Sequence, residues 1–209
     1  MLKSVSSIAL IATSLLCSVN ANAAAFDCSK AQGTVEEYIC QHPELQQLDS
    51  KLNDSFSHLL SQLKGAEQSS AQAIQRGWIK GRNDCWKSDN LGQCINDSYQ
   101  SRITELQIAS GKVVVPAPVF YQCNQAQLEV YFYNDTEVPA AVINLLPKGQ
   151  SDEQLIALLT RAASGAKYEA QNLTLWTKGD EATLIQYGKS DEQCRALDAK
   201  ALVDTKIPN

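Results

Sequence analysis

The chain has 209 residues, and its 18 basic and 23 acidic side chains give a formal net charge of −5 at neutral pH. This length allows one or two domains. The acidic balance argues against nucleic acid as a partner and favours a basic protein, because opposite net charges attract.

The first 23 residues have the pattern of a cleavable secretory signal. A basic start at Lys3 is followed by an apolar run over residues 8–16 and by an A-x-A cleavage pattern that ends at Ala23. The apolar run is too short to span a membrane. We therefore predict a signal peptide at residues 1–23, cleavage near Ala23 and a periplasmic mature protein. A lipid anchor at Cys17 remains open.

The mature chain retains an even number of cysteines. They are Cys28, Cys40, Cys85, Cys94, Cys123 and Cys194. In a secreted protein this count favours disulfides. No C-x-x-C occurs and His42 and His58 lack ligand spacing, so we predict neither a metal nor a cofactor.

Residues 24–108 are predicted to form a small three-helix domain. Apolar residues recur every three or four positions over 43–63, which is typical of a helix with one buried face. Further helices are expected over about 71–86, with Ile74, Trp78 and Cys85 on one face, and over about 93–108. Sequence alone permits three disulfide pairings. An antiparallel helical hairpin favours the nested one, Cys28 with Cys94 and Cys40 with Cys85.

The pattern changes after the helices. Residues 109–118 contain two prolines and no helical period, so we predict a linker. From residue 119 to 209 the period is two: Leu128, Val130 and Phe132 alternate with polar or aromatic neighbours. Closely spaced turns follow, which favours a small antiparallel barrel or sandwich closed by Cys123 and Cys194.

The order of the turns brings Ser164 and Lys178 to the same end of this β domain. The chain runs away from the Ser-Gly turn, reverses near Gln171-Asn172 and returns to the Lys-Gly turn. Such dipeptides are common in turns, and exposed lysines usually only contact solvent. A Ser-Lys hydrolase is the catalytic alternative, but no S-x-x-K motif or nucleophile elbow surrounds Ser164, and residues 119–209 contain no histidine. We therefore predict that the protein is not an enzyme.

The segment from Tyr121 to Cys194 closely resembles the MliC/PliC family of C-type lysozyme inhibitors. The resemblance rests on "YQC", "LEVYFYN", "ASGAKYE" and "LWTKGDEATL". It implies an eight-stranded antiparallel barrel closed by a disulfide. It also implies a lysozyme-binding site made of two loops, whose residues here are Ser164, Gly165, Tyr168, Lys178 and Gly179. In the family the serine and lysine enter the lysozyme cleft, and here Tyr168 and Trp176 are expected to support the loops.

Residues 27–107 resemble the LprI-like family of secreted four-cysteine helical domains. The matching segments are "DCSKAQGTVEEYICQHPELQQLD", "RGWIKGRNDC" and "CINDSYQSRITEL". One branch of that family is linked to lysozyme inhibition, but no contact motif can be transferred. Trp78, Arg82 and Tyr99 can be read as a binding face or as residues that pack the helices.

The leading hypothesis is an inhibitor of C-type lysozyme that protects the bacterial cell wall. The alternative is a non-catalytic envelope module that binds peptidoglycan fragments or another periplasmic protein. Lysozyme is typically basic, whereas residues 119–209 carry 8 basic and 12 acidic side chains. This difference in charge favours association.

Overall fold

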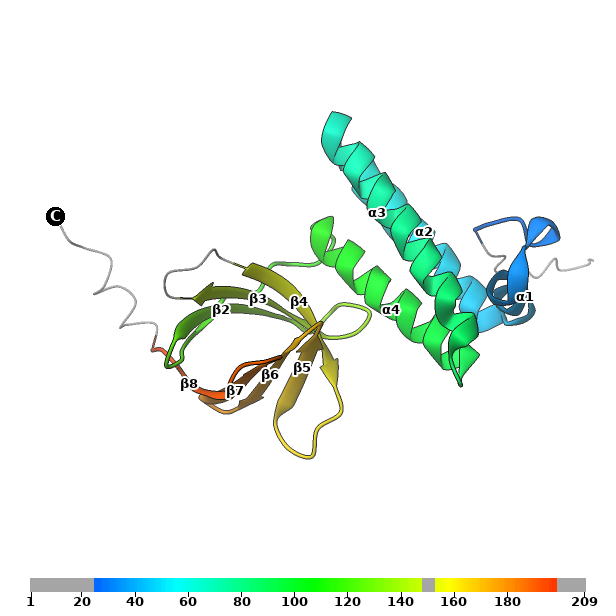
Figure 1. The fold of residues 1–209 in the computed structure, drawn as a ribbon. Coiled ribbons are helices and arrows are strands. Elements are labelled where there is room, and N and C mark those ends of the chain that lie inside the picture. The colour runs from blue at the N-terminus through cyan, green and yellow to red at the C-terminus, as the bar shows by residue number, and fades with distance from the viewer. Residues whose placement is uncertain (1–24, 148–152, 199–209) are drawn as a thin grey trace, which may run out of the picture.

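The computed structural model describes residues 25–147 and 153–198, which form a helical part followed by a closed β-barrel (Figure 1). The predicted signal peptide, its cleavage site and Cys17 lie outside the described residues. The predicted combination of a disulfide-linked helical region and an eight-stranded antiparallel barrel is confirmed. None of the described helices is long and apolar enough to cross a membrane.

Within the described residues, the helical part contains four α-helices rather than the predicted three. They are α1 (Gly33–Gln41), α2 (Pro43–Gln62), α3 (Gly65–Asn83) and α4 (Leu91–Ala109), with short 3-10 helices at Cys28–Lys30 and Asp84–Lys87. The additional helix, α1, is short and ends before Pro43. A residue that precedes proline disfavours the helical conformation, and His42 is extended there (φ −123°, ψ 100°).

The buried face of α3 differs from the predicted one. Ile74 is 56% exposed, whereas Gln75 and Arg82 are buried. Cys85 lies beyond the helix, in the following 3-10 turn. The prediction is wrong for Ile74, whereas Trp78 packs against the helical core and Cys85 is buried. Apolar periodicity missed the polar side chains because buried hydrogen bonds stabilise them: Gln75 Oε1 accepts from Arg102 Nε at 3.0 Å, and Arg82 Nη1 donates to the Tyr99 hydroxyl at 2.8 Å.

The nested disulfide pairing is wrong. Cys28 pairs with Cys40 and Cys85 pairs with Cys94, with Cα–Cα distances of 5.7 and 5.6 Å. The prediction placed Cys40 at the start of the first long helix, opposite Cys85. In the structure Cys40 lies at the end of α1, where the preceding 3-10 turn brings Cys28 to it, and Cys85 faces the first turn of α4. Both bonds therefore close local loops.

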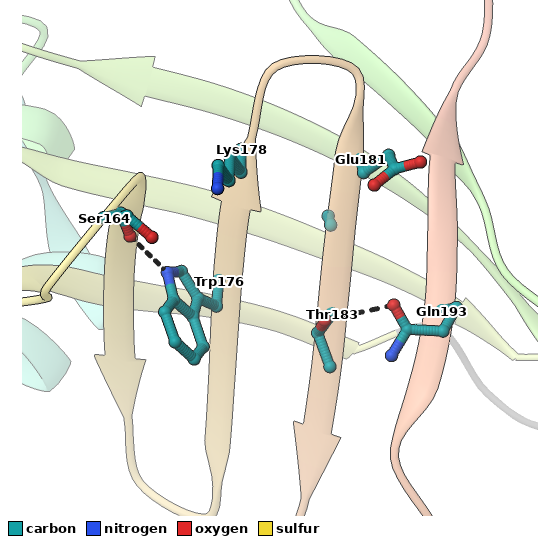
Figure 2. A pocket seen from close by; sticks show the side chains of 7 residues that line it. Ser164, Trp176, Lys178, Glu181, Thr183 and Gln193 are labelled. Carbon is teal, nitrogen blue, oxygen red and sulfur yellow. Dashed lines mark hydrogen bonds between the residues drawn. The ribbon is translucent and has the colours of Figure 1, made fainter.

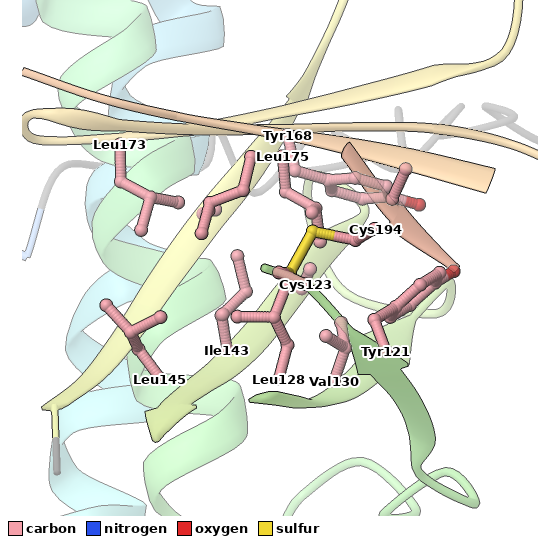
Figure 3. Packing of buried hydrophobic residues seen from close by; sticks show 14 of the residues in the cluster. Tyr121, Cys123, Leu128, Val130, Ile143, Leu145, Tyr168, Leu173, Leu175 and Cys194 are labelled. Atoms are coloured by element: carbon pink, nitrogen blue, oxygen red, sulfur yellow. A yellow bond between two sulfur atoms is a disulfide. The ribbon is translucent and has the colours of Figure 1, made fainter. Parts of the chain in front are cut away.

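The barrel closes on itself between its first and last strands. Its strands are β1 (Val119–Gln122), β2 (Ala126–Tyr133), β3 (Ala140–Pro147), β4 (Glu153–Thr160), β5 (Ala166–Ala170), β6 (Leu173–Lys178), β7 (Glu181–Gln186) and β8 (Glu192–Ala196). Each pairs antiparallel with the next, and β1 pairs with β8. The expected alternation holds on β2, where Leu128 and Val130 are fully buried. Figure 3 shows Leu128 and Val130 beside the Cys123–Cys194 disulfide in the core.

The two parts contact each other through the loop at residues 134–139, between β2 and β3. The Thr104 hydroxyl accepts from the Val138 N–H at 3.0 Å, and Gln107 Oε1 accepts from the Glu137 N–H at 2.8 Å. Lys51 on α2 forms an ion pair with Glu137. Residues 110–118 connect α4 to β1 without regular structure. Because side chains of α2 and α4 bind the barrel loop, the division into two independent domains stays a prediction.

The disulfides should differ in their contribution to stability. Replacing Cys123 and Cys194 together by alanine should lower the free energy of unfolding by about 4 kcal/mol, because the bond closes a loop with a sequence separation of 71. The same change at Cys85 and Cys94, with a separation of 9, should cost about 3 kcal/mol. Denaturant unfolding of both variants measures the difference. Peptide mapping without reduction checks the pairing, and a Cys40–Cys85 crosslinked fragment would contradict it.

Candidate functional site

The barrel geometry brings Ser164 and Lys178 to the same end of neighbouring strands. Ser164 lies one residue before the left-handed Gly165 that leads into β5, and Lys178 is the last residue of β6. The two strands are paired in register, with Ala166 opposite Thr177. Both residues are exposed and line one pocket of about 280 Å³ (Figure 2). The structure thus brings together the hydroxyl and the ammonium that the turn order predicted.

Backbone contacts hold the Ser164 loop in place. The indole Nε1 of Trp176 donates to the carbonyl of Ser164 at 2.8 Å, which ties the loop to β6 (Figure 2). Gly165 has φ +69°, and a Cβ at this position would lie 2.2 Å from the carbonyl oxygen of Thr177. Only glycine avoids both the strained dihedral and this clash. The loop is therefore fixed through its backbone, and within the described residues the hydroxyl of the exposed Ser164 has no hydrogen-bond partner.

Tyr168 supports this end of the barrel from inside. It is 5% exposed and packs against Phe132, with ring centroids 5.2 Å apart. Burial raises the pKa of its hydroxyl. This position fits the expectation that Tyr168 supports the loops, and it leaves little of the side chain for a partner to touch. Trp176, at 39% exposed, both holds the loop and presents its ring to the pocket.

The charges around the pocket leave one cation free. Within the described residues Lys178 Nζ has no hydrogen-bond or ion-pair partner. Glu181 is its cross-strand neighbour, but the Glu181 carboxylate is 3.3 Å from Arg195 Nη2. Lys167, the second cation near Ser164, pairs with Glu169, and this contact lowers the pKa of the Glu169 carboxyl. The site therefore presents a free hydroxyl and a free ammonium side by side.

An exposed hydroxyl and an unpaired ammonium can both donate hydrogen bonds to an acidic group. Within the described residues no cluster of three or more His, Cys, Asp or Glu side chains could hold a metal ion. The polar pocket residues that sequence reasoning did not single out are Glu181, Thr183 and Gln193. They lie on β7 and β8, next to the buried residues Ala182 and Cys194. The alternation of small apolar and polar residues in the sequence could have indicated that these polar side chains face outward.

One end of a small antiparallel barrel thus carries the exposed Ser164 and Lys178 side chains. Residues 121–193 match the family model described as membrane-bound lysozyme-inhibitor of c-type lysozyme. Residues 27–109 match the model described as lysozyme inhibitor LprI. Both resemblances seen in the sequence are thus confirmed.

Curated relatives match across both parts of the chain. The lipoproteins LprI of Mycobacterium tuberculosis and Mycobacterium bovis are each 28% identical over 164 residues, which is 78% of this chain and 79% of theirs. An alignment of 164 residues is longer than either the helical part or the barrel, so it includes residues of both. A membrane-bound lysozyme inhibitor of C-type lysozyme from Cupriavidus necator is 32% identical over 80 residues, 38% of this chain and 60% of the relative. No solved structure matches.

The two glycines of the site should respond differently to alanine. Gly165→Ala should lower the free energy of unfolding by about 2 kcal/mol or more, because a left-handed residue is strained and its Cβ meets the Thr177 carbonyl. Gly179→Ala is the matched control: φ is +60° but nothing lies within 4 Å of its Cβ, so only about 1 kcal/mol of strain is expected. Denaturant unfolding measures both. Equal losses would show that the close approach to Thr177 is unimportant.

Proposed function

We infer that the protein inhibits C-type lysozyme in the cell envelope by inserting the Ser164 and Lys178 tips into the enzyme's cleft. The observation that carries this proposal is the unpaired Lys178 ammonium beside the free Ser164 hydroxyl at one end of a rigid barrel. The matches to two lysozyme-inhibitor families support the target. The disulfides support an oxidising compartment such as the periplasm.

The chemistry of lysozyme explains why these groups would inhibit it. The enzyme cleaves peptidoglycan with a protonated carboxylic acid and an ionised carboxylate that face each other across the cleft. An ammonium ion from Lys178 pairs with the carboxylate, and the Ser164 hydroxyl hydrogen-bonds to the acid. The backbone of the two loops then occupies the space of the sugar. Glutamate and aspartate side chains elsewhere on the barrel favour the approach of a basic enzyme.

Rigidity of the site should contribute to affinity. The Ser164 loop is held by the Trp176 indole and by the close contact of Gly165 with β6, so little conformational entropy is lost on binding. Arg195 holds Glu181 away from Lys178, which keeps the ammonium available. Each of these contacts can be removed without changing Ser164 or Lys178 themselves.

Lys178→Ala should abolish most of the inhibition. Loss of one partner of a desolvated charge pair costs about 2–5 kcal/mol, so the inhibition constant should rise by roughly 30-fold or more. Lysis of peptidoglycan-containing cells by a C-type lysozyme measures this effect. The control is Lys189→Ala, which removes an exposed lysine from the β7–β8 turn at the opposite end of the barrel. If the wild-type chain binds wall fragments and does not protect cells, the envelope-module alternative replaces this proposal.

Arg195→Ala should weaken inhibition several-fold, because the released Glu181 carboxylate can pair with Lys178 across the strands. Adding Glu181→Gln to this variant should restore inhibition, since the amide does not neutralise the ammonium. The same lysis titration compares the three proteins. If net charge alone governed affinity, Arg195→Ala would instead bind a basic enzyme more tightly.

A further inference from the structure

The helical part contains a pocket of about 310 Å³ that the barrel site does not use. Its wall is apolar and largely aromatic, with Phe26, Leu52, Phe56, Trp78 and Ile79. Ile79 is 37% exposed at its edge, and the two phenylalanines and Trp78 are partly buried. Pockets that bury small ligands begin at about 300 Å³, so this one admits a single long side chain.

Arg82, the cation that lines this pocket, is already fully engaged. Its side chain is 4% exposed and its guanidinium carbon lies 5.5 Å from the ring centroids of both Trp78 and Tyr99. Its nitrogens donate to the Tyr99 hydroxyl at 2.8 Å and to Asn83 Oδ1 at 2.8 and 3.1 Å. Burial raises the pKa of the Tyr99 hydroxyl far above its ordinary value, so Tyr99 stays protonated and donates to Asp49 Oδ1 at 2.8 Å.

Two carboxylates and one guanidinium line the described part of the pocket. Asp49 and Glu36 lie 3.8 and 3.9 Å from Arg82, beyond the range of a strong hydrogen bond. Both Asp49 oxygens have other donors, because Oδ1 accepts from the Tyr99 hydroxyl and Oδ2 from the Ala25 N–H at 2.7 Å. Glu36 Oε2 accepts from the Gln32 N–H at 2.9 Å, but Oε1 has only the long contact with Arg82. Arg102, behind Gln75, is balanced by Glu105 at 2.7 Å. The Glu36 oxygen is therefore an acceptor with spare capacity at the edge of an aromatic pocket.

We propose that this pocket binds an arginine or lysine side chain of the same lysozyme that the barrel inhibits. The aliphatic stem of such a side chain lies along Leu52, Phe56 and Ile79, as amphipathic side chains commonly do. Its charged head contacts Glu36 and the face of Trp78, which together offer an ion pair and a cation–π interaction. A carboxylate ligand is disfavoured here, because Arg82, the one cation among the described lining residues, is already bonded and two carboxylates would repel it.

This inference rests on the proposed function for the identity of the partner, but the pocket's chemistry can be tested separately. The chain offers a matched pair of variants on α1: Glu36 lines the pocket, whereas Glu37 is exposed and does not line it. Changing either to glutamine removes one negative charge at nearly the same place. Long-range attraction to a basic enzyme therefore falls equally in both variants.

The affinity of the full mature chain for a C-type lysozyme, measured by calorimetry, should fall roughly tenfold with Glu36→Gln and less than twofold with Glu37→Gln. Asn53→Trp, which fills the pocket from its exposed edge and leaves the Arg82 hydrogen bonds intact, should weaken binding as much as Glu36→Gln. Equal affinities for all these proteins, with lysozyme still inhibited, would show that the pocket does not bind lysozyme. The proposed function of the barrel would then be unaffected.

Butylguanidinium, which mimics an arginine side chain, tests the pocket without lysozyme. Titrated into the full chain, it should shift the backbone amide resonances of Glu36 and Ile79, and Glu36→Gln should abolish these shifts. If the wild-type chain neither binds nor inhibits lysozyme, the proposed function fails, and such shifts would still establish a cation site. Absence of shifts at millimolar concentrations of the probe would rule out the site.

Discussion

Closure of the β-sheet between β1 and β8 determines where every functional group of the barrel lies. An antiparallel sheet that closes on itself returns its turns alternately to two ends, so the turns after β2, β4 and β6 must share one end. The closing contact is short, with only Tyr121 and Gln122 in register with β8. A hydrogen bond from the Leu197 N–H to the Phe120 carbonyl extends it, and the Cys123–Cys194 bond lies beside it. The barrel that carries the candidate site is thus closed by a short seam next to a disulfide.

The strands hold the backbone of Ser164 and Lys178 in place, so the side chains of these two residues need no stabilising contacts of their own. Ser164 is held through its carbonyl. Lys178 is the last residue of β6 and pairs in register with Glu181 on β7. Their polar side-chain atoms are consequently free to bind a partner without first breaking internal hydrogen bonds. The same logic explains why Glu181 and Glu169 have cations of their own in Arg195 and Lys167. Glu181, the cross-strand neighbour of Lys178, is therefore already paired with Arg195.

The sequence predicted the barrel, and the placement of Ser164 and Lys178 at one end of it, more accurately than the helical part, for a physical reason. Alternation along strands and turns rich in glycine are local signals, and antiparallel order then determines which turns are neighbours. The helical part depends on tertiary contacts. The local signal for α1 was weak: two apolar residues, Val35 and Ile39, lie four positions apart before Pro43. Without α1 the disulfide pairing could not be derived. On α3, apolar periodicity favoured Ile74, but Gln75 turns inward instead and accepts a buried hydrogen bond from Arg102.

The attachment of the helical part to the barrel has a geometric consequence for any partner. The loop at residues 134–139 binds Thr104 and Gln107, and it follows β2, so it lies at the same end as Ser164 and Lys178. A hydrogen bond from the Leu159 N–H to the Pro139 carbonyl joins this loop to the end of β4, from which the Ser164 loop continues. Figure 1 shows α4 running past this end of the barrel. Because the loop and the Ser164 turn are anchored to the same strand ends, the attachment to the helical part and the candidate site lie at one end of the barrel.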